Sequence, residues 1–450
     1  MTRPTSTGPR LAAAARSTLK HAVLGAAAAV DRWLGRRRRI RVLFLISNPI
    51  GYACLKPVFE ALREHPRFSV RIAEDIPGAL AVVPDAAVSR VATHRVPASQ
   101  ARWLPWDVIV ATDVVQTYFP FQPIVAMLAH GAGHGTMDRR SAVAPRANVD
   151  YFVGLCRSPQ VNLCCLNGVS RLRRIEEEAP QLLGDPTKAF VITGFPKLDA
   201  LWRQTRADRD HHLRQLGLDP ARSTVVVTSH YTERSLLRTF GRDLIATLLA
   251  SGDDVNILVT GHDRLWTDRL PAWPGGEPGG LADQLRALEQ ERPNLRFAIH
   301  VPDPVSILGA GDVFLCDNSS IFIDCCVLDR PILFFAHPDR MFHAEDVERL
   351  YRAASTVFSD LNGLPQLIRR ALAAPAQQTA ERAALVEFFL DRPGEATSRV
   401  VRTIERLATA GSGPGDRWRE FRVAAHRALE QHGYKVDSGG GLRSARERDS

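Results

Sequence analysis

The chain has 450 residues, of which 45% are hydrophobic and 24% charged, as in a soluble globular protein long enough for two domains. Its net charge is +9, but residues 36–39 and Arg41 supply five of these charges, so the basic character is partly local. No apolar stretch reaches the ~20 residues needed to span a bilayer, and no convincing secretory signal is present. We therefore expect a globular protein that does not cross a membrane.

The first segment, residues 1–39, is predicted to be a basic leader that associates with membranes. Residues 11–34 are rich in alanine, their larger apolar side chains fall roughly on one helical face, and four arginines follow directly. This pattern predicts an amphipathic helix on an anionic membrane surface, with the arginines at the headgroups. The alternatives are a helix packed on the protein's own core and an unstructured leader.

The next segment, residues 40–200, is predicted to be an α/β domain. Residues 40–46 form a continuous apolar run typical of a buried parallel strand, and a turn and a helix to about residue 64 follow. No GxGxxG motif is present, so a dinucleotide fingerprint is absent. Further strands are predicted at residues 68–72, 108–111, 123–129, 150–155 and 191–194.

A polar helical segment at 199–218 marks the predicted boundary to a second α/β domain, residues 201–410. The predicted strands of this domain are residues 224–228, 256–260, 295–300, 313–315 and 332–335, and the segment 364–409 is mostly helical. Residues 411–450 are predicted to be a polar, mobile tail in which residues 418–429 could form one more helix. Two consecutive α/β domains predict a cleft between them.

The seven cysteines give no metal signal. None has the spacing of a zinc site, and most lie in apolar runs. We expect buried, reduced thiols in a cytosolic protein. The cysteines are Cys54, Cys156, Cys164, Cys165, Cys316, Cys325 and Cys326.

Histidines recur where predicted strands end, and strand-end loops carry function more often than packing. His130 and Gly131 follow one strand, and histidine titrates near cellular pH, so His130 is a candidate general base. His134, which also precedes a glycine, is a rival for that role. His262 ends another strand and could donate to a phosphate. The alternative for each is a structural loop or capping histidine.

Hydroxyl and cationic side chains at two further strand ends are suited to phosphate. Thr228, His230 and Arg234 offer hydroxyl, imidazole and guanidinium groups after one strand. Asp317, Asn318, Ser319 and Ser320 follow another, directly before a helix that carries Asp324. Ser319 and Ser320 are either simple helix caps or phosphate ligands, and Asp324 either binds a nucleotide hydroxyl or favours the helix dipole. Asp317 is predicted to fix the turn.

The chain lacks a P-loop GK[ST], a GxSxG, an HExxH and a metal-ligand cluster. We therefore predict phosphate handling by hydroxyl and cationic side chains, with no obligatory metal and no cofactor.

Taken in order, these motifs resemble one family, the CDP-glycerol glycerophosphotransferases, which are teichoic-acid primases and polymerases. The resemblance covers residues 40–340 and uses His130-Gly131, the segment 194–199 (GFPKLD), the segment 228–233, Gly261-His262-Asp263, and Asp317 to Ser320 with Asp324 and Arg330-Pro331. This chain departs from the family at Asn318, where the family has Tyr, at Lys197 for Arg, and at Asp263 for Pro.

The resemblance implies a GT-B fold, with two Rossmann-like domains facing a central cleft. It also implies metal-independent transfer of glycerol phosphate from CDP-glycerol to a hydroxyl of a membrane-linked acceptor. By position, His130 would be the base, His262 would stabilise the pyrophosphate or departing CMP, Ser319 and Ser320 would hold phosphate, and Asp324 would contact the ribose. A related polyol phosphate remains a possible cargo.

The expected partners are a nucleotide-activated donor, a membrane-linked polymer or lipid acceptor and an anionic membrane surface, without nucleic acid. The expected location is the cytoplasmic face of the membrane. Two other classes remain open: a GT-B glycosyltransferase or nucleotide-sugar epimerase that uses a UDP-sugar, and a non-catalytic binding protein.

Overall fold

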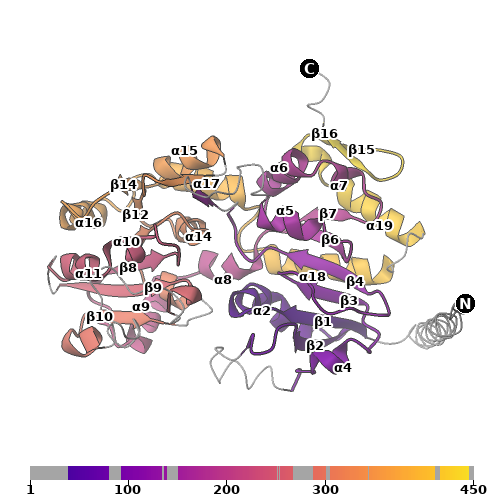
Figure 1. Ribbon diagram of the computed structural model, residues 1–450, viewed down its shortest axis with the longest axis horizontal. Helices are drawn as coiled ribbons and strands as arrows, with labels where there is room; N and C mark the ends of the chain where they lie inside the picture. The colour runs from indigo at the N-terminus through magenta and orange to yellow at the C-terminus, as the bar shows by residue number, and fades with distance from the viewer. Residues whose placement is uncertain are drawn as a thin grey trace, which may run out of the picture.

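Two parallel β-sheets, each covered by helices on both faces, form the core of the molecule (Figure 1). The computed structural model describes residues 39–80, 93–133, 136–138, 150–250, 252, 254–266, 287–299, 305–342, 344–410 and 416–444. The predicted α/β class is confirmed. The amphipathic leader and His134 lie outside the described residues.

The first sheet has six parallel strands in the order β2-β1-β3-β4-β6-β7. They are β1 (Ile40–Ile46), β2 (Phe68–Glu74), β3 (Val108–Ala111), β4 (Ile124–Leu128), β6 (Val161–Leu166) and β7 (Ala189–Ile192). The apolar run of β1 is buried from Val42 to Ile46, as a central parallel strand requires. Asn48 then caps α2 (Pro49–Glu64) by accepting from the Gly51 amide at 2.7 Å.

One predicted strand of this sheet is wrong. Residues 150–155 form α5 (Tyr151–Cys156), because the Asp150 carboxylate accepts from the amides of Phe152 and Val153 and so caps a helix. The strand after it, β6, follows a four-residue connection and was not predicted. A six-residue apolar run fits a buried strand and a buried helix equally well, so only the cap distinguishes them.

The second sheet also has six parallel strands, in the order β10-β9-β8-β11-β12-β14. They are β8 (Ser223–Ser229), β9 (Val255–Gly261), β10 (Leu295–Ala298), β11 (Val313–Cys316), β12 (Ile332–Phe335) and β14 (Thr356–Phe358). Numbered along this sheet, the order is 3-2-1-4-5-6, that of a doubly wound nucleotide-binding fold. The predicted boundary near residue 200 falls between β7 and β8.

The other helices before β8 connect the strands of the first sheet and carry the chain to the second, whose core contains Leu201 and Leu213 from the last two of them. They are α4 (Ala98–Ala101), α6 (Val169–Glu178), α7 (Gln181–Gly184), η3 (Pro196–Leu198), α8 (Asp199–Trp202) and α9 (Arg206–Gln215). Those around the second sheet are α10 (Leu236–Phe240), α11 (Arg242–Leu249), η4 (Asp263–Trp266), α13 (Val305–Gly309), α14 (Ile321–Val327), α15 (Glu345–Ala353), α16 (Leu364–Ala373) and α17 (Thr379–Phe389).

The end of the chain returns to the first sheet. Figure 1 shows α18 (Ala396–Ala410) and α19 (Asp416–Arg427) beside the strands of that sheet, and both helices contribute to its core. Trp418 and Phe421 are buried there, and the hairpin of β15 (Tyr434–Val436) and β16 (Leu442–Ser444) follows. The prediction of a mobile tail is therefore wrong for residues 416–444, and α18 packs on the first domain although it was assigned to the second.

The crossover back is held by Asp199, from the segment that leads into the second sheet. Its carboxylate accepts from the amides of Gly394, Ala396 and Thr397, at 3.0, 3.2 and 2.7 Å, and so caps the start of α18. One buried carboxylate thus fixes both connections between the sheets.

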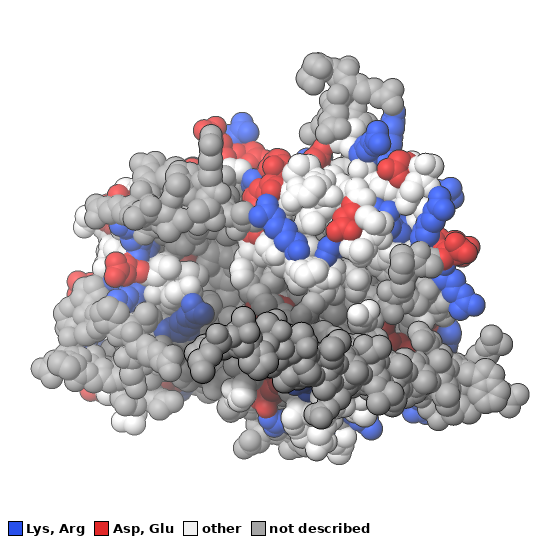
Figure 2. Space-filling view, turned by 45° about the vertical axis from the view of Figure 1, so that its right-hand side comes forward, with Lys and Arg blue, Asp and Glu red and all other residues white. Residues whose placement is uncertain are grey.

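The two sheets also touch directly. Strand β5 (Thr136–Asp138), from the loop after β4, pairs antiparallel with β13 (Arg340–Phe342), from the loop after β12. Cys54 and Ala132 join the core cluster of the second sheet. On the face shown in Figure 2, acidic and basic side chains are interspersed over the described surface.

All seven cysteines are buried and free, as predicted. Among the described residues, no helix is long and apolar enough to cross a membrane.

Candidate active site

In each sheet, polar side chains gather where the strand order reverses. Such switch points leave a crevice at the carboxyl ends of the strands, where ligands bind. In the first sheet the switch lies between β1 and β3, which are followed by Asn48 and Asp113. The Asn48 amide donates to the Asp113 carboxylate at 2.6 Å, so the two loops are joined.

His130 lies after β4, next to this switch point. Its ring centroid is 5.0 Å from that of Tyr151, whose hydroxyl donates to Asp113. Burial, and then the hydrogen bond to the Asp113 carboxylate, raise the pKa of Tyr151, so the phenol stays protonated. The His130 Nδ1 is 3.3 Å from the Thr112 carbonyl, which can only accept. The neutral ring therefore carries its proton on Nδ1 and presents an unprotonated Nε2.

The loop after His130 is held by its carbonyl groups. Arg171, from α6, donates to the carbonyl of Gly133 at 2.7 Å and also contacts those of Gly131 and Ala132. Its other guanidinium nitrogen forms a 2.6 Å ion pair with Asp150, and both side chains are almost completely buried. A buried arginine thus fixes the backbone path of residues 131–133.

In the second sheet the switch lies between β8 and β11, and Asp317 organises it. Its Oδ2 accepts from the amides of His230 and Leu236, both at 2.9 Å, and from the Ser229 hydroxyl at 3.1 Å. The structure therefore agrees with the prediction that Asp317 fixes the turn. This network sets the position of the His230 backbone directly beside the loop that carries Asn318 and Ser319.

His230 and His262 lie together on the second-sheet side. Their ring centroids are 5.6 Å apart, and the Tyr231 ring contacts both. The amide of Arg264 donates to His262 Nδ1 at 3.2 Å, and that of Thr232 donates to His230 Nδ1 at 3.4 Å. Both neutral rings therefore carry their proton on Nε2.

His262 is neutral at pH 7. Burial, followed by electrostatic interactions with His230, Arg264 and His130, lowers its pKa to about 4. His130 belongs to the first sheet, so the histidines of the two sheets are close enough to interact electrostatically.

The loop after His130 meets the second sheet at Ser320. A Cβ added to Gly131 would lie 3.1 Å from the Ser320 hydroxyl, and one added to Gly133 would lie 3.5 Å from the Ser320 Cβ. At Gly131 a side chain would crowd the Ser320 hydroxyl because the loop approaches the start of α14 so closely, whereas at Gly133 a Cβ would make ordinary van der Waals contact. The two predicted motifs, His130-Gly131 and Ser319-Ser320, are thus in contact.

Two polar atoms at this contact have no hydrogen-bond partner among the described residues. They are the Asn318 Oδ1 and the Ser319 Oγ, and both are buried. Buried polar groups are normally satisfied, so these atoms are available to a bound molecule. Ser320 is exposed beside them.

Three predicted site residues make contacts within the protein. Thr228 is fully buried and its hydroxyl donates to the Leu315 carbonyl at 3.5 Å, so it joins neighbouring strands instead of facing the cleft. Arg234 lies 3.6 Å from the Asp339 carboxylate. Asp324 forms a 2.6 Å buried ion pair with Lys197, which leaves no surface for a ribose in this arrangement. Burial raises the pKa of Asp324, and the Lys197 ammonium opposes that rise.

The sequence reasoning missed Asp113, Tyr151 and Arg171. Asp113 follows a predicted strand at a distance of two residues, so the strand-end rule that selected the histidines would have found it. Tyr151 and Arg171 carry no such signal, because their roles depend on contacts with residues far away in the sequence. Among the described residues, no group of three or more His, Cys, Asp or Glu side chains could hold a metal ion.

A comparison with protein families matches residues 186–406 to the model of the CDP-glycerol:poly(glycerophosphate) glycerophosphotransferases. Over this segment, which is slightly less than half of the chain, the sequence is similar to this glycerophosphotransferase family. The match agrees with the predicted resemblance to a transferase of the glycerophosphotransferase type. The matched segment contains His230, His262 and Ser319. It begins after His130, which it therefore does not include.

Solved structures with the same fold span nearly the whole chain. The wall teichoic acid polymerase TagF superposes with a TM-score of 0.58 at 12% identity, over 87% of this chain and 98% of that one. A TagF structure soaked with CDPG gives a TM-score of 0.57 at 13% identity, with the same coverage. These matches confirm the GT-B-like arrangement of the two sheets.

A more distant fold match is a putative UDP-N-acetylglucosamine 2-epimerase from Listeria monocytogenes, with a TM-score of 0.50 at 10% identity, over 82% of this chain and 96% of that one. No curated protein sequence matches the chain.

Proposed function

We propose that the protein transfers glycerol phosphate, or a related polyol phosphate, from a CDP-alcohol to a hydroxyl of a membrane-linked surface polymer. The observation that carries the proposal is that the first sheet supplies a proton acceptor and the second sheet supplies hydrogen-bond donors. His130 offers an unprotonated nitrogen, whereas His230 and His262 offer N–H donors beside the unsatisfied Asn318 and Ser319. The family match supports the reaction class.

In the proposed reaction, His130 Nε2 takes the proton of the acceptor hydroxyl as its oxygen attacks the phosphorus that bears the polyol. A new P–O bond forms, the P–O bond to the α-phosphate breaks, and CMP leaves with the bonding electron pair. The Thr112 carbonyl stabilises the His130 cation that results, because it accepts from Nδ1.

The donor groups of the second sheet would receive the phosphate oxygens. Neutral His262 donates from its Nε2–H, and the low pKa keeps the ring in that neutral form at pH 7. The Ser319 hydroxyl, and the Asn318 side chain rotated so that its Nδ2 instead of Oδ1 faces the ligand, would add donors whose contacts strengthen as charge develops. Arg264, beside Tyr231, supplies a fixed positive charge near the same point. The proposal assigns no step to a metal.

The test is a release assay with the full-length protein and acceptor-bearing membranes. CDP-glycerol, CDP-ribitol and UDP-sugars are supplied in parallel, and CMP and UDP are measured. The proposal expects CMP release from a CDP-alcohol that persists in EDTA. UDP release without CMP would instead indicate a sugar-nucleotide enzyme, and release abolished by EDTA would refute metal independence.

The proposed location is the cytoplasmic face of the membrane. The support is the basic amphipathic pattern of residues 1–38, which lie outside the described structure. Deletion of residues 1–38 should move the protein from the membrane fraction to the soluble fraction. The rate of CMP release in the presence of a soluble acceptor should stay unchanged. Retention of the shortened chain in the membrane fraction would refute this anchor.

A further inference from the structure

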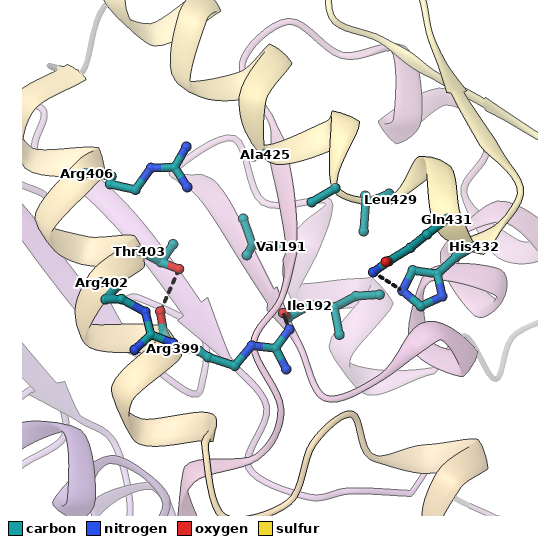
Figure 3. Close-up of a pocket in the computed structure, with 11 residues that line it drawn as sticks. Val191, Ile192, Arg399, Arg402, Thr403, Arg406, Ala425, Leu429, Gln431 and His432 are labelled. Atoms are coloured by element: carbon teal, nitrogen blue, oxygen red, sulfur yellow. Dashed lines mark hydrogen bonds between the residues drawn. The ribbon is translucent and has the colours of Figure 1, made fainter.

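A second pocket lies between α18, α19 and the edge strand β7 (Figure 3). Its volume is about 230 Å³, and none of the cleft histidines lines it. Val191 and Ile192 form its floor, α18 forms one side, and the end of α19 with η5 (Glu430–His432) forms the other. It is therefore built partly from the returning C-terminal segment.

One side of this pocket is a row of arginines. Arg399, Arg402 and Arg406 are spaced three and four residues apart, so they share one face of α18, and the row is about 10 Å long at 1.5 Å per residue. Figure 3 shows Thr403 among them and Gln431 and His432 on the opposite side.

The pocket carries positive charge that its own lining does not neutralise. Arg399 is paired with Asp391 and donates to the Ile192 carbonyl at 2.5 Å, so it is fixed in place. Arg402 has no ion pair among the described residues, and no carboxylate is among the described residues that line the cavity. An anion that enters is met by guanidinium groups and by the Gln431 amide, whereas the Thr403 hydroxyl already donates to the Arg399 carbonyl.

The same pocket has an apolar floor. Val191, Ile192 and Leu429 line it between the polar sides. A single inorganic anion would leave this floor uncovered, whereas a phosphodiester followed by a short carbon spacer matches both surfaces. Because the arginines are arranged in a row, they also suit an anion that repeats along a chain.

We propose that this pocket binds a phosphodiester segment of the polyol phosphate polymer, away from the point of transfer. The inference rests on the proposed function and adds a second contact for the acceptor or product. An enzyme that holds an earlier repeat here keeps the growing chain bound between transfers, so its products are longer. The cleft catalyses the transfer, and the pocket determines how long the polymer remains bound to the enzyme.

The test measures binding without turnover. A fluorescein-labelled oligomer of glycerol phosphate is titrated with the full-length protein at fixed ionic strength, and its anisotropy is recorded. The double variant Arg402→Ala/Arg406→Ala should bind it roughly tenfold or more weakly, since each lost charge-assisted contact contributes about that much. The variant Arg369→Ala/Arg417→Ala removes two exposed arginines outside the pocket and is the matched control.

Equal affinity of the pocket variant and the wild type overturns the proposal. An equal loss in the control variant also overturns it, because net charge alone would then explain binding. The pocket variant should release CMP with a single-unit acceptor at the wild-type rate and make shorter polymer. If the wild type itself releases no CMP, the proposed function fails. The anisotropy titration still tests whether the pocket binds the oligomer, because it does not require turnover.

Discussion

At the scale of single residues, hydrogen bonds to one ring nitrogen decide what each histidine of the cleft can do. The Thr112 carbonyl accepts from His130 and leaves its other nitrogen able to take a proton. Backbone amides donate to His230 and His262 and leave their other nitrogens able only to donate while neutral. The same residue type therefore supplies both a base and two donors.

Replacement of His130 tests the base. His130→Gln should lower kcat for CMP release by about 10²- to 10⁴-fold, because general-base assistance contributes that much, while the thermal unfolding curve stays near that of the wild type. The control is His211→Gln, which changes an exposed histidine of α9. A His130→Gln enzyme with a near-normal kcat would remove the assigned role.

The pH dependence of stability tests His262. Its pKa falls from the ordinary 6.5 to about 4 in the folded protein, so its contribution is complete above pH 6.5 and is lost as the pH falls toward 4. With about 1.4 kcal/mol per unit of pKa shift, reduced for partial solvent contact, the wild type should lose about 2 kcal/mol more than His262→Gln between pH 7 and pH 4.5.

Urea unfolding at both pH values provides the measurement. His426 also has a pKa lowered to about 4, mainly by burial, but it is present in both chains and cancels in the comparison. Parallel losses of stability in the wild type and the variant would show that His262 titrates normally.

At the scale of elements, a buried ion pair stabilises the loop that follows His130. Arg171 donates to three loop carbonyls while Asp150 neutralises it and caps α5. Helix α5 carries Tyr151 against the His130 ring. The orientation of the base thus depends on how two short elements are joined.

Arg171→Met should destabilise the protein by about 3–5 kcal/mol, because it leaves the Asp150 carboxylate buried without its partner. The double variant Arg171→Met/Asp150→Asn should recover part of that loss, but not kcat, because the loop carbonyls still lack their donor. Chemical denaturation and CMP release give the two readouts. Recovery of kcat in the double variant would show that Arg171 acts on stability alone.

Elements with long, continuous apolar runs were predicted well from the sequence. The strand at residues 40–46 and the one at 332–335 match the structure because burial on both faces of a parallel sheet leaves a strong signal. The segment 150–155 was mistaken for a strand because its cap, not its apolar pattern, determines the helix. The strand-end histidines were found, whereas their hydrogen-bond partners were not, because pairing between distant residues leaves no local pattern.

At the scale of the whole molecule, the position of the C-terminal segment in the sequence does not indicate the sheet on which it packs. Residues 396–444 follow the second sheet in sequence, yet their buried side chains join the cores of the first. Asp199 makes this possible by capping α18 from a position almost two hundred residues earlier. The composition of the tail predicted mobility because few of its residues are apolar. Those few apolar residues, such as Trp418 and Phe421, are the ones that pack on the first sheet.

Truncation after residue 410 tests whether the first sheet needs this segment. It removes Trp418, Phe421 and Leu429, each worth about 1.5–3 kcal/mol when buried, from a protein whose net stability is about 5–15 kcal/mol. It also removes the 2.8 Å hydrogen bond from Arg422 to the Lys188 carbonyl and the imidazole that accepts from the Phe190 amide, which would leave polar groups of β7 and its approach unpaired.

We therefore expect a markedly lower unfolding temperature and loss of CMP release on mild heating. The control is truncation after Ser444, which removes only residues beyond the last strand and should behave as the wild type. Thermal unfolding and limited proteolysis provide the measurements. If the chain ending at residue 410 unfolds at the wild-type temperature, the returning segment is an attachment to the first sheet and not part of its core. That result would mean that β7 stays folded with one face exposed to solvent. Its buried apolar residues make this unfavourable.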